Sequence, residues 1–152
     1  MKPVKKTIAI DIISALFILL FVYTATSKLF EHQSFRAVLS LSPLIGSKAE
    51  TLSWILPMLE LFTAALLFIP SYRKYGFVSS FILMLLFTIY VAYMILFAAN
   101  LPCSCGGVIS AMTWSQHLVF NIFFTALAFI SWRYSIRNKL FIAIDRKSRT
   151  PV

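Results

Sequence analysis

Four long apolar runs dominate this chain, at residues 8–26, 52–69, 76–99 and 114–132. A helix needs about 20 apolar residues to cross the hydrocarbon core of a bilayer, and each run is close to that length. The chain is 60% hydrophobic and only 12% charged, so a soluble domain of 152 residues could not bury its apolar surface. The sequence therefore predicts an all-α integral membrane four-helix bundle that forms one domain, residues 1–152.

Basic residues gather on one side of the predicted spans, and the net charge is +9. They precede the first run, separate the second from the third, and follow the fourth: Lys2, Lys5, Lys6, Arg73, Lys74, Arg133, Arg137, Lys139, Arg146, Lys147 and Arg149. The positive-inside rule places such ends in the cytoplasm. We therefore expect cytoplasmic termini in a bacterial inner membrane, with the lipid bilayer as a partner and no nucleic acid.

The start of the chain also has features of a cleavable secretory signal. Lys2, Lys5 and Lys6 precede an apolar run that ends in the small and polar residues 24–27. Cleavage would leave three spans. Asp11 interrupts the apolar region, and an even number of spans explains the charge asymmetry better, so we favour four.

The connecting segments carry weaker signals. Residues 31–51 have apolar spacing that suits a short amphipathic helix on the outer surface. The short basic link 71–75 predicts an antiparallel hairpin of the second and third spans. Pro57 is expected near the first turns of its helix, where proline costs little. Thr113 or Ser115 is a candidate N-cap for the fourth span.

Polar residues inside the spans are functional candidates because they are costly in hydrocarbon. Lys28 lies at the outer end of the first span, and Glu60 lies within the second. His117 and Asn121 are four residues apart on the fourth span, so they share a face. With cytoplasmic termini, all four fall in the outer half of the bilayer.

Each of these residues also has a purely structural interpretation. Lys28 can extend to the lipid headgroups or form a structural ion pair with Glu60, and a proton relay at Glu60 is the functional alternative. His117 can be a helix-end or hydrogen-bonding residue, and Asn121 can hold helices together. Asp11 could form a surface ion pair with Lys5 or Lys6.

The two cysteines of the chain, Cys103 and Cys105, lie in an uncharged segment before the fourth span. This segment should face outward, where an oxidising periplasm lets disulfides persist. A disulfide between them would close a small strained ring that adds little stability and is easily reduced. A redox-active pair, a soft-metal site for copper or zinc completed by Met112 or His117, and a pair of unreactive thiols all remain open.

Six stretches together resemble the MauE/DoxX group of redox-associated membrane proteins. They are residues 27–29 (Ser-Lys-Leu), 56–60 (Leu-Pro-Met-Leu-Glu), 87–88 (Phe-Thr), 102–107 (Pro-Cys-Ser-Cys-Gly-Gly), 114–117 (Trp-Ser-Gln-His) and Asn121. The resemblance covers all four spans. It implies a four-helix membrane bundle with a role in forming or transferring disulfides, or in passing electrons to periplasmic partners.

The chain departs from the pattern of this group at two places. MauE-like proteins typically have an aromatic residue where Gly106 stands, and DoxX-type glycines are replaced by Ala25 and Thr26. The second difference favours the MauE branch. Four-helix enzymes that form disulfides and reduce quinone usually have Cys-x-x-Cys and often a second cysteine pair, and this chain has neither.

We expect a membrane thiol–disulfide redox protein or maturation factor; if it is an enzyme, it is a thiol–disulfide oxidoreductase. Cys103 and Cys105 would exchange electrons or disulfides with a periplasmic thiol protein. His117 could favour the thiolate, and Glu60 could handle protons.

Three further residues, Lys28, Asn121 and Trp114, are expected to support this site. Lys28 would assist Glu60 if a quinone binds among the outer halves of the spans. The alternatives are a copper- or zinc-binding or transport subunit, and an assembly factor without catalysis.

Overall fold

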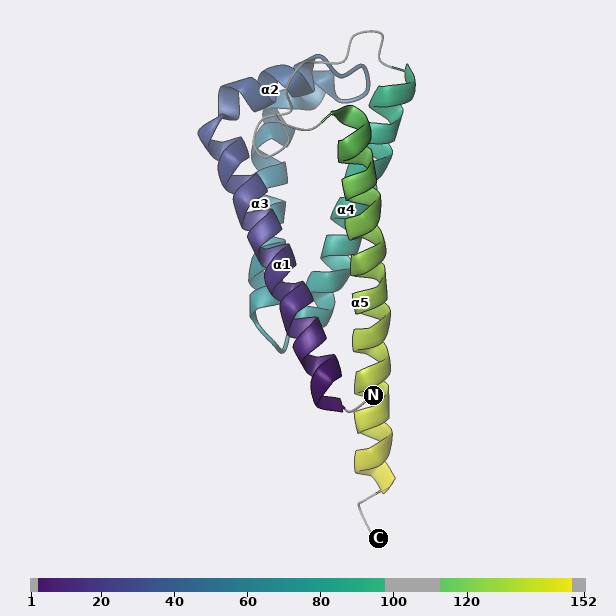
Figure 1. The fold of residues 1–152 in the computed structure, drawn as a ribbon. Coiled ribbons are helices and arrows are strands. Elements are labelled where there is room, and N and C mark those ends of the chain that lie inside the picture. The colour runs from purple at the N-terminus through teal and green to yellow at the C-terminus, as the bar shows by residue number, and fades with distance from the viewer. Residues whose placement is uncertain (1–2, 98–112, 149–152) are drawn as a thin grey trace.

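The computed structural model describes residues 3–97 and 113–148, with side chains for residues 8–97 and 113–137. Its elements are all helical, in the order α1 (Pro3–Phe30), α2 (His32–Ser40), the short turn η1 (Gly46–Lys48), α3 (Ala49–Phe68), α4 (Arg73–Phe97) and α5 (Trp114–Ser148) (Figure 1). The cysteine-bearing segment between α4 and α5 lies outside the described residues.

Four of these helices, α1, α3, α4 and α5, are long and apolar enough to cross a membrane. This confirms the all-α membrane fold predicted from the sequence. The apolar stretches run over Ile8–Phe30, Gly46–Phe68, Arg73–Phe97 and Trp114–Arg137. The protein is therefore a multi-pass membrane protein.

Helix α5 is much longer than the apolar run that predicted it. It continues from Trp114 to Ser148, although hydrophobicity falls after residue 132. At about 1.5 Å per residue, its 35 residues span about 50 Å, well beyond the hydrocarbon thickness. Figure 1 shows its C-terminal part extending past the other helices. Backbone hydrogen bonds hold a helix together in water as well as in lipid. The length of the apolar run therefore predicts the part of the helix that crosses the membrane, but not the residue at which the helix ends.

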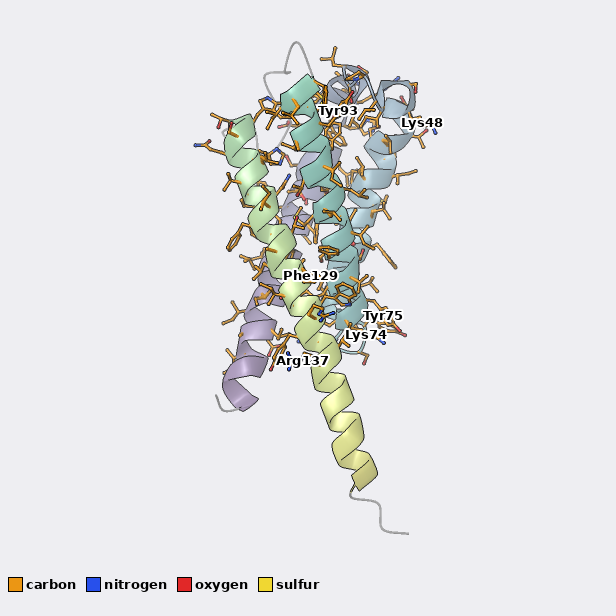
Figure 2. The ribbon with its side chains drawn as sticks, turned by 90° about the vertical axis from the view of Figure 1, so that its right-hand side faces the viewer. Lys48, Lys74, Tyr75, Tyr93, Phe129 and Arg137 are labelled. Carbon is orange, nitrogen blue, oxygen red and sulfur yellow. The ribbon has the colours of Figure 1, made fainter. Side chains whose placement is uncertain are left out.

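The bundle consists of two helix pairs, α1 with α3 and α4 with α5, joined by contacts between α3 and α4 (Figure 1). Both termini and the α3–α4 turn lie at one end of it, here called the termini end; α2 lies at the other, the α2 end. Figure 2 shows Lys74 and Arg137 toward the termini end. The predicted hairpin of the second and third spans is confirmed.

The α3–α4 turn brings its two helices very close together. Tyr72 N–H donates to the Ile69 carbonyl at 3.0 Å, and Gly76 N–H donates to the Tyr72 carbonyl at 3.1 Å. A β-carbon at Gly76 would lie 2.8 Å from both the side chain and the backbone nitrogen of Leu67. Glycine is needed here for close packing of α4 on α3.

An aromatic cluster fills the middle of the bundle. The Phe17 ring lies 5.9 Å from Phe21, 6.4 Å from Phe77 and 5.4 Å from Phe124, measured between centroids. These residues belong to α1, α4 and α5, and all are buried. The cluster therefore ties α1 to the α4–α5 pair.

Helix α2 confirms the short amphipathic helix expected within residues 31–51. Its buried residues Phe35 and Leu39 pack with Ala49 at the start of α3. His32 secures its first turn, because Nε2 lies 3.0 Å from the Ser53 hydroxyl and the ring packs, tilted by 35°, against Trp54 with 4.2 Å between the centroids. Helix α2 thus covers the end of the bundle with its apolar face.

One expectation about local structure was wrong, and one polar residue has a partner that was not expected. Helix α3 begins at Ala49, so Pro57 is buried in the helix interior and not in the first turns. Asp11 pairs with Arg73 at the start of α4, with Oδ1 2.5 Å from Nη1, and this partner was not predicted. The α3–α4 turn places Arg73 beside α1, a contact that sequence separation conceals.

Candidate functional site

Lys28 and Glu60 form a buried ion pair at the α2 end. Lys28 occupies the last turn of α1, and its Nζ donates to Glu60 Oε1 of α3 at 2.7 Å. Lys28 is 8% exposed and Glu60 is 1% exposed. Of the two alternatives that the sequence left open for Lys28, the structure shows the ion pair with Glu60 and not an extended, exposed side chain. Removing either partner would leave an uncompensated charge in the bundle.

The Lys28 ammonium also contacts two aromatic rings. Its Nζ lies 5.7 Å from the centroid of Phe35 on α2 and 5.5 Å from that of Phe87 on α4. Both distances are within the range of cation–π attraction. Four elements, α1, α2, α3 and α4, therefore surround this one cation.

The Glu60 carboxylate has unused hydrogen-bonding capacity. Its Oε2 is buried and has no hydrogen-bond partner within the described part of the chain. Thr24 lies beside the carboxylate, but its hydroxyl donates to the Phe21 carbonyl at 3.3 Å. Buried polar atoms usually have a partner, so this oxygen is a place where a ligand or a proton could be accepted.

His117 and Asn121 form a second buried pair, on α5. Thr113 caps this helix: the Gln116 N–H donates to the Thr113 hydroxyl at 3.3 Å, and the Gln116 side chain accepts from the Thr113 N–H at 3.0 Å. The cap predicted at Thr113 or Ser115 is thus at Thr113. It fixes the first turn, which carries His117.

The Asn121 amide lies 3.4 Å from the His117 ring, between Nδ2 and Nε2. In this arrangement the amide N–H of Asn121 can donate to the His117 ring nitrogen, so the two side chains form one polar pair. The shared face predicted from the four-residue spacing is confirmed. The polar path continues from the Asn121 carbonyl to the Thr125 hydroxyl at 2.7 Å, and from there to Thr88 on α4 at 3.1 Å.

Both pairs line one cavity of about 320 Å³. Residues from all five α-helices form its wall: Leu20, Phe21, Thr24, Lys28, Phe35, Leu39, Ile45, Leu52, Leu56, Glu60, Met84, Leu86, Phe87, Tyr90, Val91, His117, Phe120 and Asn121. Most of these side chains are apolar. Phe21 also belongs to the central aromatic cluster, whereas Phe35 and Leu39 come from α2, so the cavity lies between the aromatic cluster and α2.

The structure thus brings together Lys28, Glu60, His117 and Asn121. Trp114 stands at the start of α5 and does not line the cavity. The other site candidates, Cys103, Cys105 and Met112, lie outside the described residues. Among the residues that are described, no group of three or more His, Cys, Asp or Glu could hold a metal ion.

Sequence reasoning missed the α4 wall of the cavity. Met84, Phe87 and Val91 follow one another at helical spacing on α4, together with Tyr90. Spacings of three and four residues mark one helix face, and this signal was available. It was hidden because every face of a membrane helix is apolar.

A family model described as methylamine utilisation protein MauE matches residues 6–134. The matched range begins in α1 and ends within α5, so it includes both polar pairs and the whole cavity. No curated protein and no solved structure matches the chain. Because the matched range is most of the chain, the protein belongs to the MauE family of membrane proteins.

Proposed function

We propose that this protein is a membrane thiol–disulfide redox protein or maturation factor that acts through Cys103 and Cys105. The observation that carries the proposal is the convergence of Lys28, Glu60 and His117 on one cavity at the α2 end. Helix α4 ends and α5 begins at this same end (Figure 1). The two cysteines fall between those helices in the sequence.

The proposed reaction is a disulfide exchange with a partner dithiol. A partner thiolate attacks one sulfur of the Cys103–Cys105 disulfide, forms a mixed disulfide and releases the other cysteine as a thiolate. The second partner thiolate then attacks the mixed disulfide. The partner leaves as a disulfide, and Cys103 and Cys105 gain two electrons and take up the two protons that the partner thiols released.

The chemistry of the cysteine spacing favours exchange over a structural bond. A disulfide across one intervening residue closes a very short loop, which contributes little to stability. Strained disulfides have more oxidising potentials and are the labile ones. Cys103 and Cys105 therefore suit a role as oxidant of a partner.

His117 and Glu60 are proposed to handle the protons. The His117 ring lies beside Asn121 in the cavity wall, and an imidazole can accept and release a proton near neutral pH. Glu60 Oε2 offers a second acceptor. We further propose that the termini lie in the cytoplasm, because the basic residues gather there, so that the cysteines face the periplasm of a bacterial cell.

Trapping the mixed disulfide tests this function. A Cys103→Ser or Cys105→Ser variant keeps one thiol, which can attack the disulfide of an oxidised partner in the reverse of this exchange and release the other partner sulfur as a thiolate. The covalent adduct should then accumulate, and it should disappear on reduction. Ser104→Ala keeps both cysteines and should exchange normally. The proposal fails if neither single variant forms an adduct and if wild-type thiol labelling is unchanged by oxidant and by reductant.

A further inference from the structure

The cavity has the dimensions and wall chemistry of a small-molecule site. Its volume of about 320 Å³ lies at the lower end of the range for ligand pockets, which are mostly apolar with few polar groups. Its aromatic wall includes Phe21, Phe87 and Phe120. Such a wall favours a flat ring over an acyl chain.

The charges of the site indicate a neutral ligand. Lys28 and Glu60 neutralise each other at 2.7 Å, and the described wall contains no other Lys, Arg, Asp or Glu. A charged ligand would bring an uncompensated charge into a medium of low polarity, which is costly. A carboxylate or phosphate headgroup is therefore disfavoured.

Hydrogen-bonding groups are available on two sides of the cavity. On the α1–α3 side, the Lys28 ammonium has three N–H donors, of which Glu60 Oε1 takes one. On the α5 side, the Asn121 amide carries two N–H donors, of which one faces His117. Carbonyl oxygens on two sides of a ligand ring could accept from both groups.

The same site can also accept hydrogen bonds from a ligand. Glu60 Oε2 is buried without a hydrogen-bond partner among the described residues. A ligand that gains hydroxyl groups on reduction would supply the donor that this oxygen lacks. The site is thus matched to a molecule that alternates between carbonyl and hydroxyl forms.

We propose that this cavity binds the ring of a membrane quinone, between Lys28–Glu60 on one side and His117–Asn121 on the other. A quinone is neutral, flat and lipid-soluble, and it carries a carbonyl on each side of its ring. Binding by the cavity is independent of the cysteines, whereas the electron transfer described next rests on the proposed function.

The quinone is the electron acceptor that returns the cysteines to the disulfide. The reduced Cys103 and Cys105 lose two electrons and two protons as their disulfide forms. The quinone gains the same two electrons and two protons and becomes a quinol with two hydroxyl groups. The buried polar groups of the cavity stand where those protons arrive.

Binding is measured on the full chain, purified and placed in quinone-free lipid nanodiscs. Decylubiquinone and a short-chain menaquinone serve as probes, with tryptophan fluorescence quenching as the readout. Val91→Phe should weaken binding at least about tenfold, because it adds a ring to the cavity wall. Val119→Phe is the matched control, because the Val119 side chain on α5 is 66% exposed. This variant should bind as wild type does.

Asn121→Leu provides a second variant that conserves volume. It should also weaken binding about tenfold through the loss of a buried hydrogen bond, with unfolding measured alongside to show that the bundle is intact. The proposal is overturned if wild type binds neither quinone, if Val91→Phe in a folded protein binds as wild type does, or if oleate and phosphatidylglycerol compete as well as decylubiquinone.

The cysteines separate the two proposals. The double variant Cys103→Ser/Cys105→Ser should bind decylubiquinone as wild type does but fail to reduce it when dithiothreitol is the donor. Mixed-disulfide adducts without quinone binding overturn the quinone site and leave the thiol–disulfide function. Quinone binding without adducts, and without cysteine-dependent quinone reduction, supports the site and overturns that function.

Discussion

Lys28 Nζ lies 2.7 Å from Glu60 Oε1 and so joins the last turn of α1 to α3 inside the bundle. The two residues are 32 positions apart in the sequence. Their contact places one cation and one anion in the wall of the same cavity, where each makes the burial of the other tolerable. Loss of either residue alone should therefore destabilise the α2 end more than loss of both residues together.

Removing one partner should destabilise the bundle strongly. Lys28→Met or Glu60→Gln should each lower the free energy of unfolding by about 3–5 kcal/mol. The remaining partner is then either a buried charge without a counterion or a group that must become neutral, and both states cost free energy. The double variant Lys28→Met/Glu60→Leu should recover most of that loss. Denaturant unfolding in detergent micelles measures all three.

The exposed pair Arg36–Glu50 provides the control for these three variants. Arg36 Nε lies 2.6 Å from Glu50 Oε2, yet both side chains are more than half exposed. Such pairs contribute about 0–1 kcal/mol, so Arg36→Ala should change little. Equal effects at Lys28 and Arg36 would contradict a structural role for the buried pair.

The aromatic cluster should depend on Phe17 above all. Phe17→Ala should lower the free energy of unfolding by about 3–5 kcal/mol, because it leaves a cavity among three rings. Phe62→Ala is the control, because the Phe62 side chain on α3 is 59% exposed and loses few protein contacts. Similar thermal shifts for the two variants would show that the cluster does not hold α1 to the α4–α5 pair.

Gly76→Ala should destabilise the protein although alanine favours helix. An unhindered glycine-to-alanine change in a helix gains about 1 kcal/mol. Here the new methyl group would lie 2.8 Å from Leu67, so we expect a loss of about 1–3 kcal/mol from overpacking. Ile89→Ala, at an exposed position of α4 outside the cavity wall, is the control. A Gly76→Ala variant that unfolds later than wild type would contradict the close contact of α3 with α4.

The proposed orientation predicts the sidedness of the cysteines. A membrane-impermeant maleimide should label Cys103 and Cys105 in intact spheroplasts only after reduction with an impermeant phosphine. A Ser71→Cys residue in a cysteine-free background lies in the α3–α4 turn and should be labelled only after lysis. The reverse pattern would place the cysteines in the cytoplasm and remove the basis for a periplasmic partner.

Much of the fold could be read from hydropathy and charge. Long apolar runs predicted the spans, a short basic link predicted the hairpin of α3 and α4, and amphipathic spacing predicted α2. The candidate residues Lys28, Glu60, His117 and Asn121 were found because polar groups are rare in apolar helices. Pro57 was misplaced because the start of α3 at Ala49 had no strong signal in the sequence.

By itself, the sequence determined how far along the bundle axis each polar residue lies. Each helical residue advances about 1.5 Å along the axis, so hydropathy alone placed both polar pairs at one level of the bundle. Only the tertiary structure decided which faces of the helices meet. It also showed that Asp11 pairs with Arg73 and that a cavity separates Phe21 from α2. The reason is physical, because all faces of a membrane helix are apolar and their rotation is set by side-chain packing against neighbouring helices.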